Sequence, residues 1–171
     1  MSPEQSPQFT TFQAELESVK SEFLHLLATI PDEDWNRRIP GERWTVKQEL
    51  AHVAQALQTL PDGIRRATTG HGGALLAFTP VALRNWANGF IIIPLISRQE
   101  TRASIAAEYE VAQAVLLDLL ATLPDDAWSK GARLGEYRTV EQMAHRPAEH
   151  LAEHTAHLRH ILGLENELAE G

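Results

Sequence analysis

The 171-residue sequence contains no cysteine. This absence excludes disulfide bonds, metal sites built from thiolates, and a thiol nucleophile supplied by the chain itself. Long hydrophobic runs are also absent: the longest covers residues 90–96, includes Pro94, and falls well short of the ~20 apolar residues that span a bilayer. We therefore expect no membrane association, and any sulfur chemistry would need an external thiol.

Clustered positive charge is missing as well. The formal net charge is −8, and the Lys and Arg residues form no group that could neutralise a phosphate backbone. The first nine residues have neither the basic nor the apolar region of a signal peptide. We expect a cytoplasmic protein with no nucleic-acid partner.

Length and composition fit one globular domain. The 43% hydrophobic and 22% charged residues are ordinary for a folded protein, and 171 residues are enough for one core but not for two typical domains. The sequence predicts a single domain over residues 1–171, with a frayed tail over residues 164–171.

Two parts of the chain repeat each other. Residues 26–35 read LLATIPDEDW and residues 119–128 read LLATLPDDAW, followed by TVKQ at 45–48 and TVEQ at 139–142. Both TVxQ segments match a capping box, in which the Thr hydroxyl and the Gln side chain bond to the first free amides of a helix. The sequence therefore predicts an internal duplication with two equivalent helix starts.

Apolar residues recur at helical spacing in four segments, and nothing resembles the alternation of a β-strand. The residues expected to face the core are Phe12, Leu16, Val19, Phe23, Leu26, Leu27, Val46, Leu50, Val53, Leu57, Leu60, Ile105, Val111, Val115, Leu116, Leu119, Leu120, Val140, Met143, Leu151, Leu158 and Ile161. The prediction is an all-α fold, an up-and-down four-helix bundle with an internal two-fold duplication.

An irregular insert over residues 70–97 separates the two predicted helical hairpins. It is rich in glycine, and one short helix is expected near residues 81–87. Its large apolar residues, among them Trp86 and Phe90, are compatible with a core, with the wall of a substrate pocket, or with a homodimer surface.

Five of the eight histidines lie between residues 145 and 160. His150 and His154 are one helical turn apart, a spacing at which two imidazoles can share a metal ion, and His157 continues the same stripe. His145 and His160 point to other sides of the helix and are expected to be solvated. A polar pair satisfied by hydrogen bonds is the alternative interpretation of His150 and His154.

The position of His52 favours the metal interpretation. In the duplicated frame it is equivalent to Arg146, one turn before His150. A bundle with two-fold related halves would bring His52 toward His150 and His154 from the facing helix. Three neutral imidazoles with one or more waters make an open site for zinc or nickel, with iron and manganese as alternatives.

Residues 44–52, WTVKQELAH, and residues 148–154, AEHLAEH, resemble the DinB/YfiT superfamily of metal-binding four-helix bundles. The resemblance covers nearly the whole chain. Members of that superfamily commonly hold a metal with one His of the second helix and an H-x3-H or E-x3-H pair of the last long helix. The resemblance thus implies His52, His150 and His154 as ligands.

Pro147 is a departure within the last predicted helix. Proline has no amide hydrogen to bond to the carbonyl of Met143, so we expect the helix to bend or break before the ligands. The geometry of His150 and His154 depends on that bend, and His157 is an alternative ligand.

Two short motifs offer competing interpretations. The H-x-x-E-H pattern at residues 150–154 is that of inverted zinc peptidases, but those enzymes are much larger, and Glu153 is expected to point away from the histidines into solvent. Glu49 and His52 form E-x-x-H, as in di-iron bundles, which also need inward glutamates on other helices. A single-metal site is the better account; Glu49 is expected on a solvated face, with support of a ligand as the alternative.

A metal held by these histidines would act as a Lewis acid on a bound water, thiol or carbonyl. The superfamily includes S-transferases and isomerases that use low-molecular-weight thiols such as bacillithiol or mycothiol. The resemblance implies a metal-dependent transferase, isomerase or hydrolase with an unknown small-molecule substrate. The alternatives are a non-catalytic, stress-linked homodimeric metal-binding protein and a protein with no metal. Spacing identifies no catalytic residue beyond the ligands.

Overall fold

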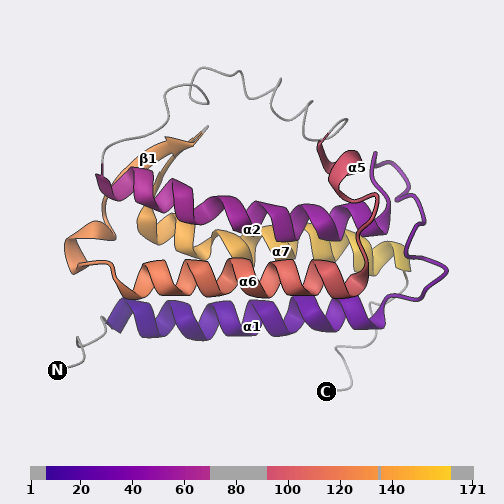
Figure 1. Cartoon of the computed structure of the whole chain (residues 1–171), viewed down its shortest axis with the longest axis horizontal. Helices are drawn as coiled ribbons and strands as arrows, with labels where there is room; N and C mark the ends of the chain where they lie inside the picture. The colour runs from indigo at the N-terminus through magenta and orange to yellow at the C-terminus, as the bar shows by residue number, and fades with distance from the viewer. Residues whose placement is uncertain (1–6, 70–91, 135, 163–171) are drawn as a thin grey trace.

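The computed structural model describes residues 7–69, 92–134 and 136–162, and this part of the chain is mostly helical, as predicted. Four long helices lie side by side (Figure 1): α1 (Pro7–Thr29), α2 (Val46–Thr69), α6 (Arg102–Ala121) and α7 (Val140–Leu162). The shorter elements are helix α5 (Ile93–Ile96), the 3-10 turn η2 (Asp125–Ala127), and strands β1 (Gly131–Leu134) and β2 (Glu136–Thr139). None of these helices has the length and hydropathy to cross a membrane.

Several expectations fall outside the described residues. They are the short helix near residues 81–87, the surroundings of Trp86 and Phe90, and the tail over residues 164–171. Within the predicted insert, the structure describes only its end, where residues 93–96 form α5.

The long helices pack in a closed set of neighbours. Helix α2 contacts α6 and α7, and α1 contacts the same two helices. In Figure 1, α1 and α7 run in one direction while α2 and α6 run in the other. The up-and-down expectation is therefore wrong at one step, since α2 and α6 run parallel.

Most of the predicted apolar stripes form the core. All six residues named in α1 are buried, as are Val46, Leu50, Val53 and Leu57 of α2. Removing each such side chain from water contributes roughly 1.5–3 kcal/mol. The sequence predicts that Val111 and Val115 face the core, but they are 65% and 42% exposed. Helix α6 is apolar around most of its circumference, so periodicity alone does not identify its buried face.

Both predicted capping boxes are present. The amide of Gln48 donates to Thr45 Oγ1 at 3.4 Å, and the Thr45 amide donates to Gln48 Oε1 at 3.0 Å. Thr139 and Gln142 make the same pair of bonds at 3.2 and 2.9 Å. These bonds satisfy amides that have no partner inside the helix. Helices α2 and α7 therefore begin where the sequence places them.

A small hairpin precedes α7, contrary to the expectation of no strand. Strands β1 and β2 pair antiparallel, from Gly131 opposite Thr139 to Leu134 opposite Glu136. Four residues per strand are too few for an alternating pattern to stand out in the sequence. The first half has a single bridge at the matching place, between Arg38 and Thr45.

Candidate metal centre

The three histidines singled out from the sequence lie together between α2 and α7. His52 comes from α2, while His150 and His154 come from successive turns of α7, which packs against α2. One ring nitrogen from each lies within 4.8 Å of those of the other two. Nitrogens that share a tetrahedral zinc ion at ~2.0–2.1 Å are about 3.4 Å apart. Small side-chain movements would therefore bring all three onto one ion.

The imidazoles contact one another closely. Ring centroids are 5.1 Å apart for His52 and His150, 5.2 Å for His52 and His154, and 4.4 Å for His150 and His154. Burial, the neighbouring histidines and Arg146 together lower the pKa of His52 to about 3. Burial, His154 and Arg146 lower the pKa of His150 to about 4. At neutral pH these two rings are uncharged, which is the form that binds metal.

Glu49 fixes the orientation of His154. Its carboxylate is 6% exposed, and Oε1 lies 2.6 Å from His154 Nδ1. The expectation of a solvated Glu49 is wrong, and its carboxylate instead contacts one of the histidines predicted as ligands. With Nδ1 engaged by the carboxylate, Nε2 is the nitrogen of His154 that is left for a metal.

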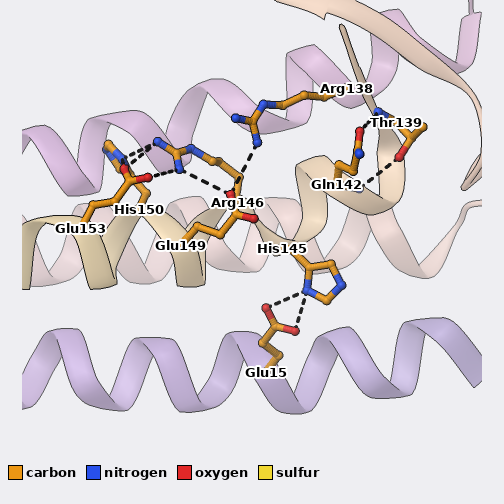
Figure 2. A network of polar contacts seen from close by, with 9 residues as sticks. All are labelled: Glu15, Arg138, Thr139, Gln142, His145, Arg146, Glu149, His150 and Glu153. Carbon is orange, nitrogen blue, oxygen red and sulfur yellow. Dashed lines mark hydrogen bonds and ion pairs between the residues drawn. The ribbon is translucent and has the colours of Figure 1, made fainter. Parts of the chain in front are cut away.

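His150 has a different partner. Arg146 Nη2 lies 3.1 Å from His150 Nδ1, and the same guanidinium forms a two-pronged ion pair with Glu153 at 2.8 and 2.9 Å (Figure 2). Glu153 Oε2 is also 3.4 Å from His150 Nδ1. The sequence predicts that Glu153 points away from the histidines into solvent. Its side chain is 57% exposed, but it lies against Arg146 and His150.

One atom of the cluster favours a bound ligand. Nε2 of His150 is buried and has no hydrogen-bond partner among the described residues. A buried polar nitrogen without a partner costs free energy, on the order of 1–3 kcal/mol. A metal ion shared with His52 and His154 would satisfy this nitrogen, so the donor set fits a divalent ion.

The family model of the DinB superfamily matches residues 15–158. This match covers most of the chain and includes all three histidines. The chain belongs to the DinB superfamily. The resemblance drawn from the WTVKQELAH and AEHLAEH segments is thereby confirmed. No curated protein and no solved structure gives a significant match to this DinB-superfamily chain.

A small cavity adjoins the histidines of this DinB protein. Its volume is about 160 Å³, and it lies where α2, α6 and α7 meet. The lining is largely apolar, with Val53, Leu57 and Leu60 on α2, Tyr109 on α6, and Arg146, Pro147 and His150 on α7. The Trp44 ring also contacts His52, with centroids 4.7 Å apart. The cluster is thus partly enclosed by apolar surface.

Pro147 does not break α7. The helix is continuous from Val140 to Leu162, with Pro147 buried inside it. The missing amide hydrogen is tolerated because buried residues on both sides, Met143 and Leu151 among them, hold the helix in the core. His150 and His154 therefore keep regular helical spacing.

The remaining histidines of α7 divide into two groups. His145 is not simply solvated: its Nδ1 contacts the Glu15 carboxylate of α1 at 2.9 and 3.0 Å (Figure 2). Its ring also meets that of Phe12 edge-on. The side chains of His157 and His160 lie outside the described ones. The expectation that His157 is an alternative ligand therefore stays a prediction.

Proposed function

We propose that His52, His150 and His154 bind one divalent transition-metal ion, zinc or nickel before iron or manganese, and that the loaded protein is an enzyme. The observation that carries this proposal is the convergence of three imidazole nitrogens within 4.8 Å, together with the buried Nε2 of His150, which has no hydrogen-bond partner among the described residues. Two of the imidazoles are held neutral by burial. Membership of the DinB superfamily supports the same ligand set.

The proposed reaction class follows from the kind of site. Three protein ligands leave a tetrahedral ion with an open position, as in catalytic rather than structural zinc sites. A bound ion would supply Lewis-acid chemistry toward a water, an external thiol or a carbonyl. The chain's own residues orient His154 through Glu49 and offer an apolar cavity beside His150. We therefore propose a thiol-dependent transferase or isomerase, or a hydrolase, acting on a small molecule.

The proposal includes the architecture that builds the site. We infer a duplicated four-helix bundle, because the backbone amide of Lys47 donates to the carbonyl of Trp35 and that of Glu141 donates to the carbonyl of Trp128 at equivalent places. Each half then contributes one helix to the metal site, α2 from the first and α7 from the second.

Elemental analysis tests the metal site. Protein purified without a histidine tag should carry close to one equivalent of metal per chain, whereas His52→Ala and His154→Ala should carry far less. His25→Ala, which changes an exposed histidine of α1, is the matched control and should resemble the wild type. Equal metal content in all four proteins would sink the proposal.

A non-catalytic, homodimeric metal-binding protein is the second candidate. It is favoured by exposed apolar side chains at the end of the insert, where Leu95 is 60% and Ile96 is 40% exposed. Cobalt-loaded protein distinguishes the two candidates. If the ion has an open position, adding 2-mercaptoethanol should change the visible spectrum through a thiolate ligand; an unchanged spectrum favours the non-catalytic candidate.

A further inference from the structure

Two neighbouring ligand histidines have partners of opposite hydrogen-bonding character. His154 Nδ1 faces a carboxylate, Glu49, at 2.6 Å. His150 Nδ1 faces a guanidinium, Arg146, at 3.1 Å. A carboxylate accepts a hydrogen bond from the ring N–H, whereas a guanidinium can only donate. The Glu49 contact and the Arg146 contact therefore favour opposite tautomers in the two rings.

These contacts bear on which nitrogen of His150 carries the proton. In the arrangement where Arg146 donates to Nδ1, the single proton of the neutral ring lies on Nε2. That nitrogen is the buried one without a hydrogen-bond partner. A metal ion binds through a lone pair, so His150 cannot offer Nε2 to a metal in the tautomer whose Nδ1 accepts from Arg146.

The same side chains allow a second arrangement. Glu153 Oε2 lies 3.4 Å from His150 Nδ1 and accepts a hydrogen bond when that nitrogen carries the proton. Arg146 would then lose part of its contact with Glu153, but it also lies 3.4 Å from Glu149 and would keep that partner (Figure 2). Arg146 therefore keeps a carboxylate partner in both arrangements, with Glu153 in the first and Glu149 in the second.

Resting on the proposed metal site, we propose that Arg146 and Glu153 form a switch that sets the tautomer of His150 and thereby its readiness to bind metal. With Arg146 on Nδ1, the ring is closed to metal. With Glu153 accepting from Nδ1–H, Nε2 is free to bind. The exchange through solvent removes one proton from Nε2 and places one on Nδ1, so the ring stays neutral. Both residues are positioning residues for His150.

The test uses opposite effects of two substitutions in one network. Arg146→Met removes the competing donor and should tighten zinc binding, whereas Glu153→Gln weakens the acceptor and should loosen it, each by about tenfold. Arg138→Met is the matched control. It removes the same charge as Arg146→Met, and Arg138 also pairs with Glu149, at 3.5 Å. Zinc affinity is measured by competition with a chromophoric chelator.

Nitrogen-15 NMR of the histidine rings in metal-free protein provides the second readout. His150 should be the Nε2–H tautomer in the wild type and in Arg138→Met, and should shift toward Nδ1–H in Arg146→Met. A wild-type His150 that is already Nδ1–H overturns the inference, as do two variants that both weaken zinc binding. Wild-type protein that binds no zinc overturns the proposed metal site itself, a separate result.

Discussion

At the scale of single residues, the charge state of His52 and His150 links the site to stability. Both rings are largely removed from water and lie against other imidazoles, and the charge of Arg146 also opposes their protonation, so a positive charge on either ring is poorly stabilised. In the unfolded chain the same rings titrate near their ordinary pKa of 6.5.

This difference predicts acid sensitivity in metal-free protein. Between pH 6.5 and the lowered folded pKa values of about 3 and about 4, the unfolded state binds more protons, so stability falls as pH falls. The free energy of unfolding should drop by about 1.4 kcal/mol per pH unit for each ring. Urea unfolding between pH 6.5 and 4.5 measures this slope.

Variants assign the slope to these rings. His52→Gln and His150→Gln should each flatten it, while His25→Gln, at an exposed position of α1, should leave it as in the wild type. Identical slopes in all four proteins would contradict the assignment.

The residues of the site differ in how far the sequence could predict them. The meeting of His52 with His150 and His154 follows from helical spacing and the duplication. Glu49 could not be assigned, because its partner His154 is 105 positions away and only the packing of α2 on α7 brings them together. Arg146 and Glu153 did leave a signal, since 146, 150 and 153 are one helical turn apart on one face of α7.

At the scale of elements, the capping boxes are the clearest agreement between sequence and structure. Thr45→Ala removes the hydroxyl that accepts the Gln48 amide and should lower the free energy of unfolding by about 1 kcal/mol. Thr59→Ala is the matched control. Thr59 is exposed within α2, where alanine is the better helix former, so this variant should be neutral or stabilising. Equal losses in both, measured by urea unfolding, would contradict a capping role.

The sequence mispredicts secondary-structure elements and their directions where the local pattern and the tertiary packing disagree. Pro147 signals a helix break, yet packing keeps α7 continuous. The hairpin before α7 forms by strand pairing within nine residues, and its short strands show no alternating pattern in the sequence. The parallel course of α2 and α6 depends on where the intervening chain leads, which periodicity does not encode.

At the scale of the whole molecule, metal binding should appear as added stability. Zinc at a hundredfold excess over its dissociation constant should raise the free energy of unfolding by about 2.7 kcal/mol, because it binds the folded chain alone. Thermal unfolding with zinc and then with a chelator checks this, and His154→Ala should not respond. The same melting temperature under both conditions in the wild type would exclude a metal site.

The placement of His52 in one half of the chain and His150 and His154 in the other has a mechanical consequence. An ion held by all three would cross-link two helices at points separated by about 100 residues of chain, a constraint of the kind that disulfides impose on other proteins. In the chain-entropy description, closing a loop of that length removes on the order of 4–5 kcal/mol of freedom from the unfolded state. A chain without cysteine would thereby have a cross-link that forms when metal is available and is lost when metal is removed.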